Sequence, residues 1–247
     1  MLKIKKEKTK CYFYGEFGCL NYAILGHIEE QQPDIIISTQ PDYFELMKLK
    51  CNKIEKDKDL NIYRAKCVGA GFGLGIKDER IDDLQKLGYK HIKEVLGLSG
   101  KRCIDFIKPI KNPLTHEMNL QEEFISISFR KRTHEAERNL PEEDWIDIIQ
   151  FIKNNTNLKI VAHGMDIDTY DFDLQKPNNI HESIAYMNKS KIFIASMSGI
   201  AQFASNCQCP VIQIGEPDRH IEYDPFGKRA EATRLEGFKE LFLDYIK

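Results

Sequence analysis

The segment 191–227, KIFIASMSGIAQFASNCQCPVIQIGEPDRHIEYDPFG, decides the fold interpretation of this chain. It reads as an apolar strand over 192–195, a turn of small residues, and a helix that opens at Gly199 and Ile200. A second apolar strand over 210–214 and a charged loop rich in Gly, Pro and Asp follow. A strand that feeds a small-residue turn and a helix aims free backbone N–H groups at one point. The segment therefore predicts an anion site, most often one for phosphate.

The same rhythm of strands and helices extends along the whole chain. In the first half, strands are expected within 11–18, 34–38 and 61–68, and helices within 19–30, 41–50 and 77–87. In the second half, strands are expected over 124–129 and 159–162, and helices over 141–154, 180–188 and 235–245. Short buried strands that alternate with helices predict an α/β fold with parallel sheets.

A segment with two prolines and no clear period, 109–123, is interpreted as a linker. It divides the chain into an N-terminal domain, 1–112, and a C-terminal domain, 113–247. Both halves repeat the strand–helix pattern, so we expect two Rossmann-like domains that face a cleft. Ligands of parallel sheets lie at the carboxyl ends of the strands, which directs attention to the loops that follow them.

Composition bounds the class of protein. The chain has 247 residues, 42% of them hydrophobic, and a net charge of −2, which is typical of a globular protein and argues against nucleic acid as a partner. We expect no signal peptide, because Lys3, Lys5 and Lys6 are followed by further charge, and no transmembrane segment. The seven cysteines form no CxxC pair, so we interpret them as reduced thiols of a cytoplasmic protein without a metal site.

Two groups of residues at strand ends are candidate phosphate ligands. In the turn from Ser196 to Gly199, small residues allow a phosphate to approach the helix, and Ser198 can donate its hydroxyl; a helix N-cap explains the same residues. Arg130, Lys131 and Arg132 directly follow a strand, where cations suit a diphosphate because arginine offers a bidentate fork. A solvated basic turn is the alternative for these three cations.

Two carboxylates are candidate functional groups. Glu16 follows the first strand within GEFG, where it suits a general base, or simply an acid at a helix start. Glu182 begins the helix before the key strand, where it suits a ribose hydroxyl or, equally, the helix dipole. His163 is interpreted as a loop polar residue, with contact to a base or sugar as the second option. The spacing in 69–75, GAGFGLG, differs from G-x-G-x-x-G, which favours a flexible loop or a lid over a dinucleotide site.

Taken together, these segments resemble the lipopolysaccharide heptosyltransferases, which are glycosyltransferases of the GT-B fold. The similar elements occur in the same order and are ISISFRKR, RNLPEEDWIDII, HESIAYMNKSK, IASMSGIAQFAS and GEPDRHIEYDPFGK, within 124–229. Fucosyltransferases show a looser likeness, through FRKRT and GEFGCLN. The resemblance implies a GT-B fold with a reduced N-terminal domain, a nucleotide-diphosphate sugar as donor, and no metal or other cofactor.

Carried onto this chain, the resemblance implies a role for each candidate residue. Arg130, Lys131 and Arg132 would bind the diphosphate, and Ser196, Ser198 and Gly199 would cradle a phosphate. Glu182 would hold the ribose, His163 and Gly164 would lie near the base, and Glu16 would take the place of the catalytic carboxylate. Two positions depart from the family pattern: Met197 stands where an Asp is usual, and Gln202 where a His is usual.

The resulting hypothesis is an inverting, metal-independent glycosyltransferase that moves a sugar to a hydroxyl of a glycan or glycoconjugate. Glu16 would deprotonate the acceptor, and the arginines and the Ser198–Gly199 turn would stabilise the leaving diphosphate. Two alternatives stay open. One is a non-catalytic nucleotide- or sugar-binding protein on a degenerate GT-B scaffold, and the other is a nucleotide-sugar epimerase.

Overall fold

The computed structural model describes residues 9–13, 24–38, 53–56, 85–98, 107–133, 136–164, 166–220 and 222–247. The chain divides into two compact units, Met1–Lys111 and Asn112–Lys247. Within the described residues, no helix is both long and apolar enough to cross a membrane. The cysteines that are described, Cys11, Cys207 and Cys209, are buried free thiols.

The first unit contains a parallel sheet with the strand order β3-β2-β1-β4. Its elements are β1 (Lys10–Phe13), α2 (Leu25–Gln31), β2 (Ile35–Ser38), β3 (Lys53–Lys56), β4 (Lys90–His91) and α5 (Ile92–Val95). Parts of the predicted strands at 11–18 and 34–38 and of the helix within 19–30 are present among the described residues, as β1, β2 and α2. Strand β3, KIEK, was not predicted, because it carries one apolar residue. The predicted elements at 41–50 and 61–68, most of the helix at 77–87 and the glycine-rich loop lie outside the described residues.

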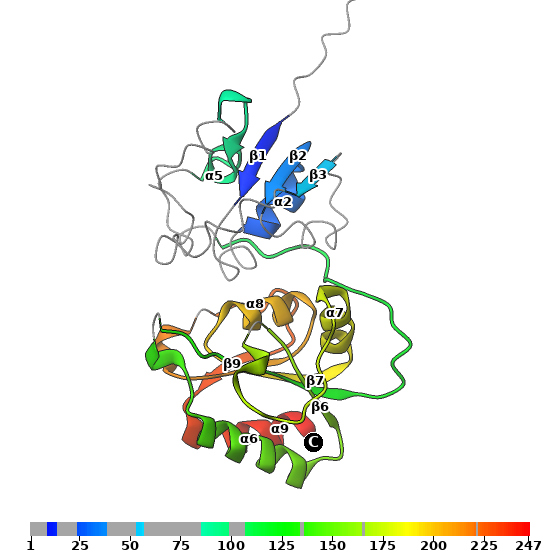
Figure 1. Cartoon of the computed structure of the whole chain (residues 1–247), viewed down its shortest axis with the longest axis vertical. Coiled ribbons are helices and arrows are strands. Elements are labelled where there is room, and N and C mark those ends of the chain that lie inside the picture. The colour runs from blue at the N-terminus through cyan, green and yellow to red at the C-terminus, as the bar shows by residue number, and fades with distance from the viewer. Residues whose placement is uncertain are drawn as a thin grey trace, which may run out of the picture. The chain divides into compact units, whose positions relative to one another are not determined.

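The second unit is built on a sheet of five parallel strands with the order β6-β5-β7-β8-β9 (Figure 1). The strands are β5 (Phe124–Ser128), β6 (Lys159–Ala162), β7 (Ser190–Ser196), β8 (Val211–Ile214) and β9 (Ala230–Thr233). The predicted α/β class with a parallel sheet is therefore confirmed. The edge strand β9, AEAT, was not predicted: it has only small and charged residues, and all four are half-buried.

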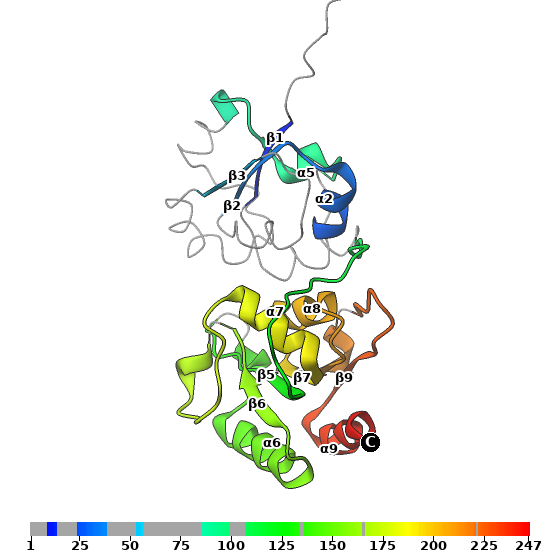
Figure 2. The ribbon, with the colours of Figure 1, turned by 90° about the vertical axis from the view of Figure 1, so that its right-hand side faces the viewer.

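Helices cover both faces of this sheet, as Figures 1 and 2 show. One face carries α6 (Glu142–Asn155) and α9 (Leu235–Ile246), and the other carries α7 (Ile180–Lys189) and α8 (Gly199–Asn206). Three short 3-10 helices lie in the loops: η4 (Ala136–Arg138), η5 (Ile167–Thr169) and η6 (Pro217–Arg219). Each α-helix of this unit begins within one residue of its predicted start, because Pro and polar residues mark those positions.

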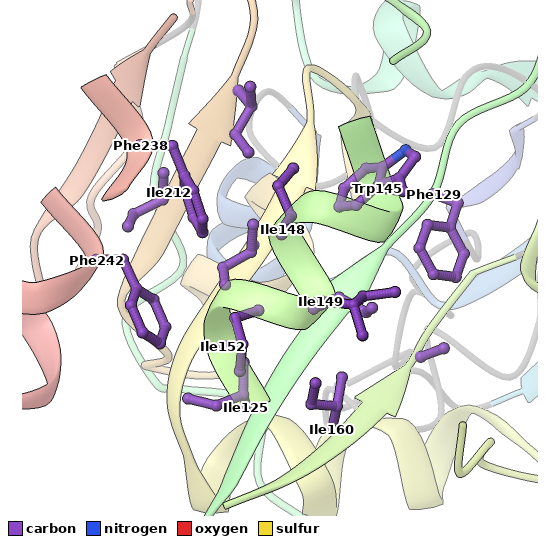
Figure 3. Close-up of a cluster of buried hydrophobic side chains, with 14 of the residues drawn as sticks. Ile125, Phe129, Trp145, Ile148, Ile149, Ile152, Ile160, Ile212, Phe238 and Phe242 are labelled. Carbon is purple, nitrogen blue, oxygen red and sulfur yellow. The ribbon is translucent and has the colours of Figure 1, made fainter. Parts of the chain in front are cut away.

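The main core lies between the sheet and the pair α6 and α9 (Figure 3). The buried residues of α6 are spaced three and four apart, so they form one face of the helix: Trp145, Ile148, Ile149 and Ile152. Trp145 is fully buried and meets the Phe129 ring edge to face, with centroids 4.9 Å apart. Burial of each such side chain contributes about 2 kcal/mol. This core fixes the end of β5, where the basic loop begins.

Residues 107–123 contain no helix or strand, as expected of a linker, but the middle of this segment is held firmly. The Leu114 amide donates to the Asn206 carbonyl oxygen at 2.8 Å, and the side chain of Leu114 is only 3% exposed. The Asn188 amide nitrogen donates to the carbonyl oxygens of Leu114 and Cys207, at 3.0 and 2.8 Å. The linker is thereby attached to the carboxyl end of α8.

Candidate functional site

The strand order places a ligand position between β5 and β7. From β5 the chain crosses to β6 through α6, on one face of the sheet, and from β7 it crosses to β8 through α8, on the other face. Loops that leave two neighbouring strands toward opposite faces separate, and this topological switch point is where open parallel sheets bind ligands. The loops after β5 and β7 are those that carry the predicted cations and the Ser196–Gly199 turn.

Two serine hydroxyls, one at the last residue of β7 and one in the turn after it, lack a hydrogen-bond partner in the described part of the chain. The Oγ atoms of Ser196 and Ser198 are buried and have no hydrogen-bond partner among the described residues, and we call such a buried side-chain atom an orphan atom. Ser198 occupies the N-cap position of α8, with extended backbone angles of φ −156° and ψ 159°, yet its side chain makes no cap hydrogen bond within the described residues. The simple N-cap explanation of this serine therefore does not hold here.

The loop after β5 is organised by Asn139. The Asn139 Oδ1 accepts hydrogen bonds from Arg130 Nη1 at 2.6 Å and from the Arg132 amide at 3.1 Å, and its Nδ2 donates to the Arg132 carbonyl oxygen at 2.7 Å. Arg130 is only 5% exposed, so it is not a solvated turn residue. A buried guanidinium held in one orientation is suited to a bidentate anion.

Lys131 and Arg132 turn toward the loop after β6. Asp166 Oδ2 accepts from the Lys131 amide at 3.3 Å and from Arg132 Nε at 3.2 Å. The Lys131 Nζ lies 4.9 Å from the centre of the Tyr170 ring. Both cations are exposed, and the Asp166 carboxylate offsets part of their charge. Their part in diphosphate binding stays a prediction, with Arg130 the better placed of the three.

Arg138 is a residue that the sequence interpretation missed. Its Nε and Nη2 both donate to the Met197 carbonyl oxygen, at 3.0 and 2.5 Å. This charged fork joins the loop after β5 to the turn after β7, across the switch point. It fixes the peptide between the two orphan serines. The only sequence signal was a further arginine six residues after the FRKR run, in a segment interpreted as the approach to a helix.

His163 is buried, not an exposed loop residue. Its side chain has no exposed surface, and its Nε2 lies 2.9 Å from Ser126 Oγ. Burial lowers the pKa of His163 to about 3, so the ring is neutral at ordinary pH. Its Nδ1 is an orphan atom. Gly164 has φ +101°, and a Cβ there would lie 3.0 Å from Ser128 Oγ and 3.3 Å from Ile200 Cδ1. Gly164 is therefore close to the start of α8, and its contact with a nucleobase stays a prediction.

Glu182 caps its own helix. Its carboxylate accepts from the Asn178 amide at 2.8 Å and from Asn178 Nδ2 at 2.9 Å, while its amide donates to Asn179 Oδ1 at 3.0 Å. This reciprocal arrangement supports the helix-chemistry alternative. The start of α7 lies at the carboxyl edge of the sheet, because the helix follows β6. A ribose contact stays a prediction.

Met197, one of the two departures from the family pattern, points at the loop after β8. Its side chain is 4% exposed, and a Cβ on Gly215 would lie 2.8 Å from both its Cγ and its Sδ. Any side chain at 215 would therefore force the buried Met197 side chain to move. Gln202, the other departure, is buried in the first turns of α8 at 6% exposure.

The orphan atoms gather at one edge of the sheet. There are five in the described residues: Trp145 Nε1, His163 Nδ1, Ser196 Oγ, Ser198 Oγ and His220 Nε2. Each belongs to a loop that follows a strand, to the last residue of a strand, or to the first turn of the next helix. Buried polar groups without partners are rare in proteins, and their occurrence at the carboxyl ends of successive strands indicates a ligand or ordered solvent there. The carboxyl edge of the β5–β9 sheet is therefore the candidate site.

The predicted catalytic base, Glu16, lies outside the described residues. No group of three or more His, Cys, Asp or Glu side chains in the described part of the chain could hold a metal ion.

The geometry defines a parallel, Rossmann-type sheet with an anion-suited switch point, and comparison with solved structures extends this description. No protein-family model matches the chain, and no curated protein matches it in sequence. The chain is similar to the ADP-heptose lipopolysaccharide heptosyltransferase II of E. coli, with a TM-score of 0.60, 8% identity, and coverage of 97% of this chain and 98% of that one.

A second similar structure is the iron-containing dodecameric glycosyltransferase TibC from enterotoxigenic E. coli H10407. The TM-score is 0.52 at 14% identity, over 90% of this chain. TibC in complex with ADP-D-β-D-heptose gives 0.50 at 13% identity, over 91% of this chain. The chain spans 63% of the length of TibC. The predicted resemblance to heptosyltransferases is confirmed at the level of the fold.

Proposed function

We propose that this protein is a glycosyltransferase that moves a sugar from a nucleotide-diphosphate sugar to a hydroxyl of a glycan acceptor. The proposal includes a two-domain GT-B arrangement with a reduced N-terminal domain, inversion at the anomeric carbon, and no metal requirement. The similarity in fold to heptosyltransferases, one of which binds ADP-D-β-D-heptose, supports this class of donor.

One observation carries the proposal: the orphan hydroxyls of Ser196 and Ser198 lie at the start of α8, on the opposite side of the switch point from Arg130. Buried hydroxyls without partners cost stability, roughly 1–3 kcal/mol each, unless something accepts or donates a hydrogen bond. The N-terminus of a helix favours negative charge, and an arginine supplies a positive fork. A diphosphate can accept hydrogen bonds from both hydroxyls and is attracted by the Arg130 guanidinium, which also donates to Asn139.

In the proposed reaction, the diphosphate is the leaving group. Arg130 and the amides at Ser198 and Gly199 stabilise the charge that develops on it, and Arg138 holds the Met197 peptide so that these amides stay in place. Glu16 removes the proton of the acceptor hydroxyl as its oxygen attacks the anomeric carbon. Gly164 and His163 lie beside the nucleobase of the donor, and Glu182 exchanges a cap hydrogen bond for one to the ribose.

The test is the affinity of the double variant Ser196→Ala/Ser198→Ala for ADP, GDP, UDP and CDP, measured by calorimetry. Wild-type protein should bind at least one of them. Each hydrogen bond to a charged phosphate contributes about 1.5–3 kcal/mol, so we expect the double variant to bind at least about 100-fold more weakly. Its thermal stability without ligand should be unchanged or higher, because the lost hydroxyls have no partners among the described residues.

Ser190→Ala is the matched control. Ser190 is buried in the same strand, but its hydroxyl donates to the Tyr186 carbonyl oxygen at 2.9 Å and contacts Ser126 Oγ at 2.6 Å. We expect this variant to lose stability and keep its affinity. Equal affinities for wild type and the double serine variant would remove the phosphate site from this turn.

The catalytic part of the proposal is tested at Glu16. Glu16→Gln keeps the size of the side chain and removes its basicity, so transfer should slow by about 100-fold or more while donor affinity stays unchanged. Full activity of this variant would end the assignment of the base.

Met197 favours a second candidate function, a nucleotide- or sugar-binding protein without catalysis. Its thioether is packed against Gly215, so this position offers no polar group to a ligand. Binding of a nucleotide sugar without transfer or hydrolysis, across a panel of donors and hydroxyl acceptors, would support this second candidate.

A further inference from the structure

His220 lies in the loop after β8 and contacts the sheet through one residue. Its Nδ1 is 2.9 Å from the side-chain nitrogen of Gln213, which is only 4% exposed. An amide nitrogen is a donor, so Nδ1 is the acceptor in this pair. The proton of the neutral ring is therefore on Nε2, and Gln213 fixes this tautomer.

The other ring nitrogen, Nε2, has no hydrogen-bond partner in the described part of the chain. His220 Nε2 is an orphan atom, and with its proton it is a buried donor without an acceptor among the described residues. Burial lowers the pKa of His220, and the nearby Glu222 carboxylate opposes this only in part, so the ring stays neutral. A neutral imidazole with a fixed N–H is a hydrogen-bond donor, and it suits an uncharged oxygen such as that of a hydroxyl.

The place of His220 in the sheet assigns the part of the ligand that it meets. Gln213 is in register with Ala195, one residue before the end of β7, on the face that α8 covers. His220 therefore lies one strand beyond the phosphate turn, on the side away from β5. Gly164 lies on the other side, at the end of β6. In the proposed order along this edge, the nucleobase lies next to β6, the diphosphate lies at β5 and β7, and the part of the donor beyond the diphosphate lies at β8.

We propose that His220 positions the donor sugar, by donating its Nε2–H to a hydroxyl oxygen of the sugar that is attached to the diphosphate. This inference rests on the proposed function, and it adds the direction in which the donor lies along the sheet. Met197 offers no polar contact to a ligand, and in this proposal His220, in the neighbouring loop, provides one instead.

Two variants separate the two ring nitrogens. His220→Asn places an amide near the position of Nδ1, so it keeps the acceptor for Gln213 and loses the outward donor. His220→Gln reaches the position of Nε2 with an amide N–H, so it keeps the outward donor. Both remove the ring, and we expect similar melting temperatures for the two. A structural role of His220 would give them similar ligand affinities as well.

The measurement is calorimetric affinity for ADP, GDP and UDP, and for ADP-glucose, GDP-mannose and UDP-glucose. The comparison uses the nucleotide series, adenine, guanine or uracil, that the wild-type protein binds. In that series we expect His220→Asn to bind the nucleotide sugar about tenfold more weakly than wild type and the nucleoside diphosphate as tightly as wild type. His220→Gln should recover most of the loss. Equal losses for both kinds of ligand, or no loss for the nucleotide sugar, would overturn the inference and leave the proposed function standing. If wild type binds none of the nucleoside diphosphates, the proposed function itself fails.

A readout without ligand tests the first step. Nitrogen-15 NMR of labelled protein should show His220 as the Nε2–H tautomer, and Gln213→Glu should move the proton to Nδ1, because a carboxylate accepts and cannot donate. An Nδ1–H tautomer in the wild type would contradict the inference directly.

Discussion

The interior of the β5–β9 sheet and its carboxyl edge treat the same kinds of side chain in opposite ways. In the interior, Ser126 and Ser190 bond each other, and Ser190 also donates to the Tyr186 carbonyl oxygen. At the edge, Ser196 and Ser198 carry orphan hydroxyls. Both pairs are serines of the same parallel strands and turns. The difference teaches that two serines of the sheet are paired within the fold, whereas the two beside α8 have no partner among the described residues, as the proposed phosphate site requires.

The two ends of α8 repeat this contrast. At its carboxyl end, Asn206 accepts from the Leu114 amide and from the Tyr223 hydroxyl at 2.6 Å, and Asn188 bonds the Cys207 carbonyl oxygen. At its amino end, the Ser198 side chain makes no cap hydrogen bond within the described residues. One end is fixed to the linker and the loop after β8, and the other leaves its cap hydroxyl without a partner in the described part of the chain.

The largest expected effect concerns His163, which joins the two regions through its two nitrogens. Its folded-state pKa of about 3 lies below the unfolded value of 6.5, so the unfolded chain binds the proton first as pH falls. The stability from the neutral ring is complete above pH 6.5 and is lost toward pH 3, at about 1.4 kcal/mol per pH unit. Urea unfolding at pH 7.5 and 5 should differ by about 2 kcal/mol more in wild type than in His163→Gln. Equal pH slopes would show that the ring is not the source.

The next effect concerns the paired end of α8. Asn206→Ala removes a fully buried side-chain amide. The hydroxyl of Tyr223, a residue that is only 3% exposed, then loses this partner. We expect the free energy of unfolding to fall by about 2 kcal/mol. Affinity for a nucleoside diphosphate at a temperature where the variant is folded should stay within about twofold. A large loss of affinity would show that the two ends of α8 do not act separately.

A smaller effect compares two serines of β7. Ser190→Ala should lower the free energy of unfolding by about 1 kcal/mol, because Ser126 and the Tyr186 carbonyl lose a partner. Ser196→Ala should lower it by nothing measurable, or raise it. Chemical denaturation of both variants in the same buffer tests this. A loss at Ser196 equal to that at Ser190 would mean that Ser196 has a structural partner after all.

The smallest effect distinguishes two roles of Glu182. Glu182→Gln keeps the shape of the cap but removes a charge at the start of α7, which should lower stability by about 0.5 kcal/mol. If Glu182 also binds ribose, nucleoside diphosphate affinity falls while affinity for inorganic pyrophosphate does not. Calorimetry with both ligands decides between a cap alone and a cap with a second role.

Much of the second unit was predictable because its signals are local. Strands such as FISIS and KIFIA are short segments rich in isoleucine and phenylalanine, and EEDWIDII begins after a proline with acids in its first turn. Strand β9 and strand β3 were missed, because AEAT and KIEK lack an apolar run and gain their structure from pairing with a neighbour. Register partners far along the chain do not appear in a local pattern.

The site was predictable only in part, for a similar reason. That Ser198, Gly199 and Arg130 follow strands could be read from the sequence, whereas the pairing of β5 with β7 could not. That Arg138 reaches the Met197 carbonyl, or that Gln213 fixes the tautomer of His220, depends on side chains from distant segments. The burial of His163 was missed, because a histidine after a strand gives no sign of how deep it lies.

The contact between Met197 and Gly215 has a consequence for how relatives of this chain can evolve. A Cβ at 215 would lie 2.8 Å from the Met197 Cγ and Sδ, so with methionine at 197 a side chain at 215 requires this buried thioether to move. A smaller residue at 197 removes that clash, while the φ of +158° at 215 still disfavours other residues, so a change at 215 costs less stability after a change at 197 than before it. We expect the two positions to covary among close relatives, with glycine at 215 constant wherever a long side chain occupies 197.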